Sequence, residues 1–310
     1  MMKLKSKTFR SAKSMWFYIG FMAIPVLQFC IFYIGVNFNS LLLAFKTIKF
    51  DGATKQYYTA AFNFDNFINW FADSVNKKEL TDALIVSLKT YVITLCVGVP
   101  LGLLFAYYIY KKLPGSMFFR FMLFLPSIIA SIVLVTIYKY FTDNVVPEFL
   151  KIFNITLGGK LLSNPDTVYG TVMFYNLFVG FGTTVLLYSN KMATISPEII
   201  EAAELDGTNS VQEFFRIVLP QTFSTLSIFL VTGIAGIFIN EINNFSFFNY
   251  KTNPETTTLG FLMYFRVQKA KNDESQYPPL AALGIMMSVV AIPLTFAVRW
   301  LLNKVGPSED

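Results

Sequence analysis

Apolar residues along this chain gather into six long stretches rather than into a short alternating pattern. The stretches cover approximately residues 16–38, 85–110, 117–141, 168–188, 222–241 and 280–302. A helix rises about 1.5 Å per residue, so crossing about 30 Å of hydrocarbon takes about 20 apolar residues. Each stretch reaches that length. The pattern therefore predicts an all-α integral membrane protein with six transmembrane helices.

Charged residues inside these stretches lie where a membrane tolerates them. A charge at the bilayer centre costs about 2.5–3.5 kcal/mol on insertion scales, whereas a basic side chain near a helix end reaches the headgroups. The basic residues within the stretches all fall near an end: Lys89, Arg120, Lys139 and Arg299. This placement argues against a proton pump or a voltage sensor, both of which need charges at mid-membrane.

Helix-breaking and small residues recur inside the stretches. Pro100, Pro126 and Pro293 permit local kinks. Gly98 and Gly102 have the spacing that allows two helices to approach closely. Ordinary packing is the alternative for each residue alone, since Gly and Pro are frequent in membrane helices. Together they favour a helix bundle with moving parts over a single inert anchor.

The basic residues predict the orientation. The tail before the first stretch has no acid and five basic residues: Lys3, Lys5, Lys7, Arg10 and Lys13. Since cytoplasmic segments are enriched in Lys and Arg, we expect cytoplasmic N- and C-termini and outer connections at about 39–84, 142–167 and 242–279. A cleaved signal peptide is the alternative for the first stretch, but that stretch is long enough to span and no small-residue cleavage pattern follows it.

Composition narrows the possible chemistry. Of 310 residues, 54% are apolar and 14% charged, against about one-quarter charged in an average soluble domain. The absence of histidine excludes His-based acid–base catalysis, Ser-His-Asp triads and His-ligated haem. Cys30 and Cys96 lie in apolar runs and indicate neither a disulfide framework nor a metal site. The basic residues behind the net charge of +6 flank apolar runs, so membrane lipids rather than nucleic acid are the expected partner.

The inside connection between the fourth and fifth stretches, residues 189–221, is amphipathic and contains five acids. The Ser-Pro pair at 196–197 predicts a helix start, and Gly207 predicts the left-handed end of that helix. A second helix is predicted to start at Ser210, whose hydroxyl forms a capping-box pattern with Glu213. A long, acidic, structured loop on the cytoplasmic side indicates a protein partner.

The same loop carries a family motif, whose seven defined positions are Glu201, Ala202, Ala203, Gly207, Ile217, Leu219 and Pro220. This pattern is similar to the EAA loop of the permease subunits of binding-protein-dependent ABC importers. The resemblance implies that the helix around Glu201 is a coupling helix docked on a cytoplasmic ATPase subunit. The residues expected to couple the two subunits are the seven motif residues together with Glu204 and Asp206. A surface helix in the headgroup region is the alternative, but such helices are basic on their polar face.

The resemblance extends over residues 83–304. Segments at 125–141, 162–188 and 240–259 resemble carbohydrate permeases of the maltose type. These looser matches favour a sugar over an amino acid, a peptide or a metal as the solute. Tyr138 and, by alignment, Phe178 stand where the family has Trp, so individual sugar contacts cannot be carried over.

The resulting organisation has three parts. Residues 1–82 form the N-terminal tail, first span and outer loop; residues 83–304 form the permease core with the EAA loop; and residues 305–310 form the C-terminal tail. The chain contains no phosphate-binding motif of the G-x-x-x-x-G-K-[ST] type. It is therefore expected to bind no cofactor and to have no catalytic residues of its own.

The resemblance implies the remaining components. These are a second permease subunit, identical or related, a cytoplasmic ATPase dimer that binds ATP and Mg²⁺, and an extracytoplasmic solute-binding protein. The expected location is a bacterial plasma membrane.

Polar residues near span ends are candidates for the solute pathway: Asn176, Asn240, Glu241, Asn243 and Asn244. Such groups could bind sugar hydroxyls, and the neighbouring aromatic residues Phe245, Phe247 and Phe248 could stack on a sugar ring. Interfacial anchoring or loop capping is the alternative for each of them.

A secondary transporter and a membrane-embedded enzyme are the alternatives from other classes of protein. A secondary transporter would need no ATPase, but it usually has internal repeats with broken helices in matching halves, and the sequence contains no such repeat. A membrane-embedded enzyme would need paired carboxylates or a metal set at one depth, which the six stretches lack.

Overall fold

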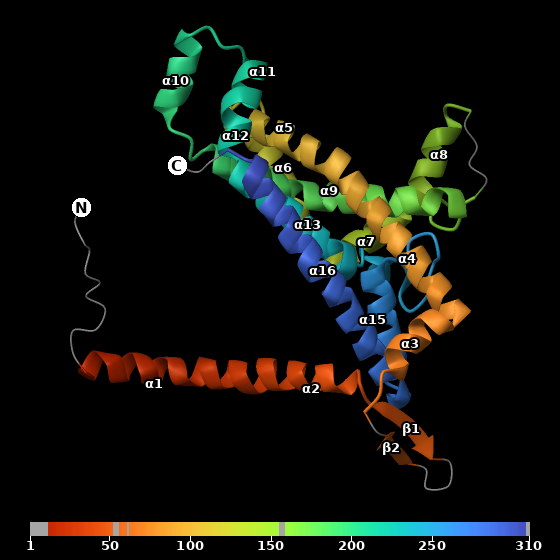
Figure 1. The fold of residues 1–310 in the computed structure, drawn as a ribbon. Helices are drawn as coiled ribbons and strands as arrows, with labels where there is room; N and C mark the ends of the chain where they lie inside the picture. Colours follow the sequence, from red (N-terminus) through yellow and green to blue (C-terminus); the bar gives the residue numbers. More distant parts are fainter. Residues whose placement is uncertain (1–11, 52–55, 61, 155–158, 308–310) are drawn as a thin grey trace. The chain divides into compact units, whose positions relative to one another are not determined.

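The computed structural model describes residues 12–51, 56–60, 62–154 and 159–307. The basic positions Lys3, Lys5, Lys7 and Arg10, on which the orientation was predicted, lie outside this part. The chain is dominated by helices (Figure 1). It divides into two compact units. Unit 1 is the chain up to Trp70 with Ala270–Ile285, and unit 2 is Phe71–Lys269 with the chain from Met286 onward.

Unit 1 begins with a continuous apolar helix. It consists of α1 (Ala12–Gln28), the π-helical turn η1 (Phe29–Gly35) and α2 (Val36–Leu43). A hairpin of β1 (Thr47–Asp51) and β2 (Gln56–Ala60) follows, antiparallel, with Thr47 opposite Ala60 and Asp51 opposite Gln56. The hairpin falls in the connection 39–84, whose secondary structure the hydrophobic pattern did not predict.

Buried side chains fix the chain that follows the hairpin. Asn66 lies in α3 (Asp65–Ala72), and its amide donates to the carbonyls of Ala44 and Lys46, both at 2.8 Å. The indole of Trp70 donates to the carbonyl of Pro279 at 2.8 Å. These bonds satisfy buried polar groups and join segments that are distant in the sequence.

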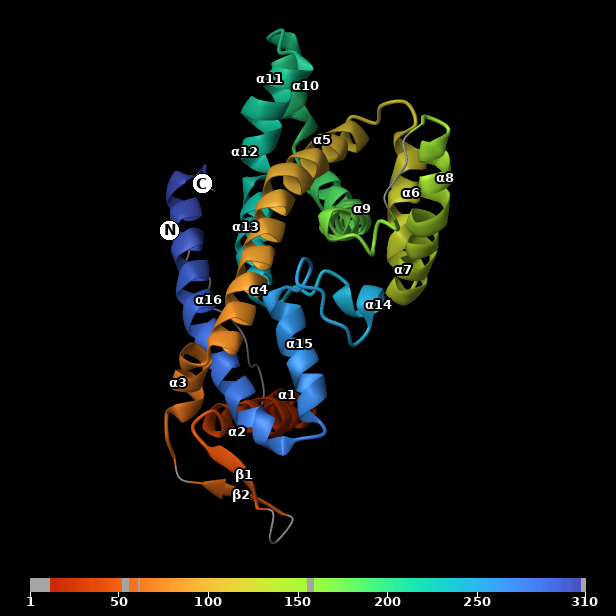
Figure 2. The ribbon, with the colours of Figure 1, turned by 90° about the vertical axis from the view of Figure 1, so that its right-hand side faces the viewer.

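Unit 2 contains the remaining helices. In chain order they are α4 (Ser74–Ile93), η2 (Thr94–Gly98), α5 (Val99–Tyr110), α6 (Ser116–Ile128), α7 (Ser131–Tyr140), η3 (Phe141–Val145), α8 (Val146–Lys151), α9 (Pro165–Met192), α10 (Pro197–Leu205), α11 (Ser210–Glu213), η4 (Phe214–Val218), α12 (Leu219–Gln221), α13 (Phe223–Ile239), α14 (Asn244–Phe248) and α15 (Leu259–Ala270). After η5 (Glu274–Gln276), α16 (Tyr277–Val305) starts in unit 1 and ends in unit 2. Figures 1 and 2 show α10 and α11 at one end of unit 2, with α15 toward the other.

By length and composition, the described helices include five that can cross a membrane: Met15–Leu43, Ser74–Tyr110, Pro165–Met192, Phe223–Phe248 and Glu274–Val305. A bent pair, Ser116–Ile128 with Ser131–Lys151, makes a sixth if it is counted as one span. The all-α membrane fold predicted from the hydrophobic pattern is confirmed.

The third apolar stretch, residues 117–141, is not one continuous helix. The pair is bent by 105° where Ile129 and Ala130 adopt extended conformations. Pro126 removes one helical hydrogen bond just before the bend. After it, Val135 is fully buried in a cluster with residues of α9 and α14. Packing on distant helices, rather than local hydropathy, decides the direction of α7.

Close packing of α5 and α6 on α9 forms the centre of unit 2. A Cβ added to Gly98 would lie 3.1 Å from the side chain of Leu177, and one added to Gly102 would lie 3.1 Å from Thr184. The small residues at the end of η2 and in α5 thus face α9, as their spacing suggested. This packing holds the end of α5 in place, and the connection 189–221 folds back onto α5 and α9.

Candidate coupling site

Helix α10 carries the first half of the EAA motif. It begins after Ser196, which has the extended backbone of an N-cap, and Pro197 occupies the first turn as predicted. The Ser196 side chain makes no capping hydrogen bond. Ile200 and Ala203 are buried, whereas Leu205 is 90% exposed.

The acidic residues lie mainly on the other side of α10. Glu198, Glu201, Glu204 and Asp206 are exposed, and Ala202 is exposed among them. The apolar side chains of α10 are therefore divided: Ile200 and Ala203 hold the helix to the protein, while Ile199 and Leu205 remain outside. This leaves α10 with an exposed face of carboxylates and apolar side chains.

The end of α10 is a Schellman motif. Thr208 N–H donates to Ala203 O at 3.0 Å and Gly207 N–H to Glu204 O at 3.1 Å. Gly207 has φ +76°, and nothing lies within 4 Å of the position a Cβ would take. Its backbone conformation, not a lack of space, therefore favours glycine there.

The second helix begins at Ser210 as predicted, but its cap lies one residue before the predicted capping residue. Its N-cap is Asn209, and the capping box joins Asn209 to Gln212, with the Gln212 N–H donating to Asn209 Oδ1 at 2.9 Å. Ser210 is the first helical residue, so the predicted Ser210–Glu213 capping box is wrong. Glu213 turns inward instead of capping. Asn209–Gln212 and Ser210–Glu213 both fit the sequence pattern of a capping box. Only the first pair caps the helix, because Glu213 is buried.

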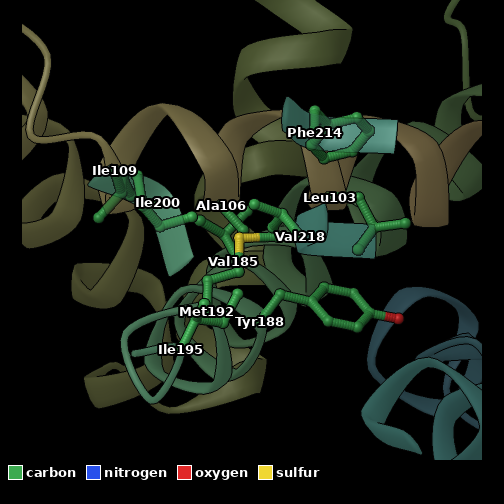
Figure 3. Packing of buried hydrophobic residues seen from close by; sticks show 10 residues of the cluster. All are labelled: Leu103, Ala106, Ile109, Val185, Tyr188, Met192, Ile195, Ile200, Phe214 and Val218. Carbon is green, nitrogen blue, oxygen red and sulfur yellow. The ribbon is translucent and has the colours of Figure 1, made fainter. Parts of the chain in front are cut away.

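From Ser210 the chain runs through η4 and α12 toward α13. Ile217, Leu219 and Pro220, the last motif positions, are half-buried along it. Phe214 and Val218 are buried in a cluster that unites the connection with α5 and α9 (Figure 3). Its members are Leu103, Ala106, Ile109, Val185, Tyr188, Met192, Ile195, Ile200, Phe214 and Val218. The loop is therefore packed on the membrane helices and not a loose connector.

Lys111, at the end of α5, makes ion pairs with both helices of the loop. Its Nζ lies 3.0 Å from Glu213 Oε2 and 3.3 Å from Glu204 Oε1. Partial burial opposes the charge of Lys111, but hydrogen bonding and attraction to Glu213 outweigh it and raise the pKa of the ammonium group. Lys111 is therefore charged at neutral pH. The neighbouring Tyr107 hydroxyl donates to the carbonyl of Ser210 at 3.1 Å.

Sequence reasoning missed the roles of Lys111, Tyr107 and Glu213. Lys111 stands beside Lys112 directly after the second apolar stretch, where the sequence alone indicates only a basic residue at a span end. The signal available in the sequence was an acid, Glu213, inside an amphipathic loop. Its partner Lys111 lies 102 positions earlier in the chain. No helical or strand periodicity links residues at that separation.

Two of the predicted pathway residues are joined by a hydrogen bond. Asn243 Nδ2 donates to Asn176 Oδ1 at 2.7 Å, and Asn176 Nδ2 donates to Ile242 O at 2.9 Å. Ser131 Oγ donates to Asn243 Oδ1 at 2.8 Å. Ser131 is the first residue of α7, and Ile242 and Asn243 both have positive φ in the irregular segment after α13. The network therefore joins the bend in the third span to α9 and to the segment that follows α13.

The other predicted pathway residues have different surroundings. Asn240 Oδ1 accepts from the Ile242 N–H at 2.9 Å, a local turn contact. Asn244 is fully buried, and its amide donates to the carbonyl of Thr256 at 2.6 Å. Glu241 is half-buried. Asn240 and Asn244 thus make the backbone-capping contacts that were the alternative to solute binding.

Comparison with known families adds one decisive observation. Residues 98–307 match the model of the family described as binding-protein-dependent transport system inner membrane component. The chain belongs to this family. The matched part includes α5, the whole connection 189–221 and the helices on which it packs.

Several relatives of this inner membrane component are named sugar permeases. The maltose/maltodextrin transport system permease protein MalF of Klebsiella aerogenes is 25% identical over 206 residues, which cover 66% of this chain and 39% of MalF. The multiple sugar-binding transport system permease protein MsmF of Streptococcus mutans is 24% identical over 276 residues, which cover 87% of this chain and 89% of MsmF. The chain thus spans less than half of MalF and most of MsmF.

Solved structures support the fold. A chain of a bacterial ABC transporter described as involved in the import of the acidic polysaccharide alginate has a TM-score of 0.79 and 20% identity, covering 94% of this chain and 97% of that chain. The same kind of transporter in complex with an alginate pentasaccharide-bound periplasmic protein has a TM-score of 0.73 and 19% identity, covering 94% and 96%. This inner membrane component therefore has the fold of an ABC importer chain.

Proposed function

We propose that this chain is the permease subunit of an ATP-driven ABC importer and forms half of the pathway for a sugar or oligosaccharide. The observation that carries the proposal is the position of α10 in a member of this family. One side of α10 is buried against the core through Ile200 and Ala203, and the other presents carboxylates and Leu205. A helix with those two faces can bind a cytoplasmic partner and pass its movement to the membrane helices.

The proposed partner at α10 is an ATPase subunit, which would bind ATP and Mg²⁺. The coupling residues are Glu201, Ala202, Glu204, Asp206 and Leu205 on the exposed side, with Gly207 setting the turn. Ala203, Ile217, Leu219 and Pro220 attach this surface to the core. ATP-driven closure of two ATPase subunits would then move two coupling helices together and switch the membrane bundle between two arrangements.

A sugar is the proposed solute because the named relatives MalF and MsmF are sugar permeases. The proposed pathway includes Asn176 and Asn243, whose amides already form a polar network within spans. Half-buried Glu241 is proposed at the end of this pathway, whereas Asn240 and Asn244 hold the surrounding backbone through their hydrogen bonds to Ile242 and Thr256. An extracytoplasmic solute-binding protein would deliver the sugar, and a second permease subunit would complete the pathway. The proposed setting is a bacterial inner membrane, with both termini in the cytoplasm.

The decisive experiment combines solute identification with reconstitution. The cognate solute-binding protein is screened against a glycan panel, and the sugar that it binds is used for uptake into proteoliposomes that contain the full complex. We expect uptake that requires both ATP and the ATPase subunits. Uptake that persists without the ATPase would identify a secondary transporter instead.

Variants of α10 locate the coupling surface. Glu201→Lys reverses a charge on the proposed docking face and should reduce both the amount of ATPase subunit that co-purifies and the uptake. Glu148→Lys is the matched control, because Glu148 is also an exposed acid but lies on α8, in a proposed outer connection. Equal losses in both variants would contradict docking through α10.

A further inference from the structure

Three charged residues connect the end of α5 to α10 and α11, the two helices at the start of the connection 189–221, which is named the coupling loop for its proposed function. Lys111 follows α5, Glu204 lies in the last turn of α10, and Glu213 ends α11. We infer that this Lys111 clasp sets the orientation of α10, so that Lys111 is a positioning residue for energy coupling. The inference rests on the proposed function, which supplies the partner of α10.

The Glu213 side of the clasp is buried. The Glu213 side chain is 3% exposed, and its Oε2 accepts from Lys111 at 3.0 Å. Its other oxygen, Oε1, has no hydrogen-bond partner among the described residues. A buried carboxylate is unfavourable unless it is paired. The Glu213 carboxylate therefore holds the Lys111 ammonium in place.

Aromatic residues close this side of the clasp. Tyr107 packs edge-to-face on Phe214 with ring centroids 5.2 Å apart, and its hydroxyl donates to the carbonyl of Ser210. Phe214 is itself buried in the core cluster. These contacts fix α11 to α5, so an ammonium held by Glu213 has a defined position relative to the membrane helices.

The Glu204 side of the clasp is open to solvent. The Glu204 side chain is 59% exposed, and its Oε1 lies 3.3 Å from Lys111 Nζ. An exposed pair is weak compared with a buried one and is screened by salt. One ammonium therefore makes a strong contact with α11 and a weak contact with α10. This asymmetry allows α10 to keep its resting orientation and still shift when a partner binds.

The turn between α10 and α11 leaves the orientation of α10 weakly restrained, so a contact from α5 has an effect there. Gly207 has positive φ and open space around it, so little besides the Schellman hydrogen bonds restricts rotation of α10 there. The Lys111–Glu204 contact adds a restraint from outside the turn. Without Lys111, α10 would retain Ile200 and Ala203 in the core but would lose its charged connection to α5.

Spin-label distances in the full-length chain test this positioning directly. Cysteines replace Leu205 on α10 and Met117 on α6, which are 90% and 87% exposed, in a background with Cys30→Ser and Cys96→Ser. Lys111→Met should widen the distance distribution roughly twofold as further orientations of α10 become populated. Glu213→Gln, which keeps the shape of the side chain, should have the same effect. Lys111→Arg should restore the narrow distribution.

Lys112→Met is the matched control. Lys112 is the next residue, is exposed and makes no ion pair among the described residues. Its replacement removes the same charge from the same loop without opening the clasp, so the distance distribution should stay narrow. Widening by Lys112→Met as large as that by Lys111→Met would overturn the inference.

ATP hydrolysis by the assembled complex gives the second readout. Lys111→Met should still retain the ATPase subunits, because the exposed face of α10 is unchanged, but hydrolysis per bound ATPase subunit should fall about tenfold, within the range for residues between coupled sites. A merely structural role would reduce expression or assembly instead. Unchanged hydrolysis or an unchanged distance distribution would each refute the clasp. If the wild-type chain retained no ATPase subunit, the proposed function would fail while the distance measurement remained interpretable.

Discussion

Individual glycines decide how closely the helices of unit 2 approach. A Cβ built on Gly182 in α9 would fall on the carbonyl oxygen of Leu123 in α6 and lie 2.8 Å from the carbonyl carbon. Backbone atoms cannot move aside as a flexible side chain does. Gly180, two residues earlier on the same helix, has nothing within 4 Å of that position. The two glycines therefore differ in function although they are neighbours in the sequence.

Gly182→Ala should destabilise the protein because α6 and α9 would have to separate. Overpacking of this kind costs about 1–3 kcal/mol, which should appear as a lower melting temperature of the detergent-purified chain. Gly180→Ala should leave the melting temperature unchanged or slightly higher, since alanine favours a helix over glycine. Equal melting temperatures for the two variants would show that α6 and α9 do not approach at Gly182.

At the scale of elements, local chemistry and tertiary packing both contribute to the boundaries. Pro197 and Gly207 begin and end α10 where the sequence predicted. Helix α11 starts at Ser210 as predicted, but its cap lies one residue earlier, because Asn209 and not Ser210 accepts the capping hydrogen bond. The third span differs more, because the 105° bend depends on the fit of α7 against α9 and α14.

Asn209→Ala should destabilise the start of α11 by about 1 kcal/mol, the usual cost of losing an N-cap side chain. Ser210→Ala should have little effect, since the Tyr107 hydroxyl binds the backbone carbonyl of Ser210 and not its side chain. Hydrogen–deuterium exchange of the Gln212 amide measures the difference. Faster exchange in the Ser210 variant than in the Asn209 variant would support the capping box predicted from the sequence instead.

At the scale of the whole molecule, the orientation in the membrane decides which surface meets which partner. Under the proposed function, the connection 189–221 faces a cytoplasmic ATPase, and the connection that contains α8 then faces outward. Leu205 on α10 and Glu148 on α8 are both well exposed. Single cysteines at these two positions therefore report on opposite sides of the membrane.

In the Cys30→Ser, Cys96→Ser background, a membrane-impermeant maleimide should label Glu148→Cys in intact spheroplasts and leave Leu205→Cys unlabelled. Inverted vesicles should give the reverse result, because the bilayer blocks the reagent from one side at a time. Labelling of both positions from the same side would refute the proposed orientation and, with it, docking of a cytoplasmic ATPase on α10.

The sequence by itself determined the membrane class, the long apolar helices and the position of the folded connection 189–221 that carries the EAA-like motif. These features depend on apolar segment length, on cap and turn residues, and on a motif, all of which are local. The closely spaced Gly98 and Gly102 also pointed correctly to helix packing, since Gly98 at the end of η2 and Gly102 in α5 both face α9.

Only the tertiary structure decided the bend in the third span, the Asn176–Asn243 hydrogen bond and the Lys111 clasp. The residues of the last two contacts lie 67, 93 and 102 positions apart. Their proximity results from the way α5 and α9 pack and from where the chain folds back onto them. Local periodicity carries no information about such pairs, because each side chain alone is equally compatible with solvent, lipid or a partner protein.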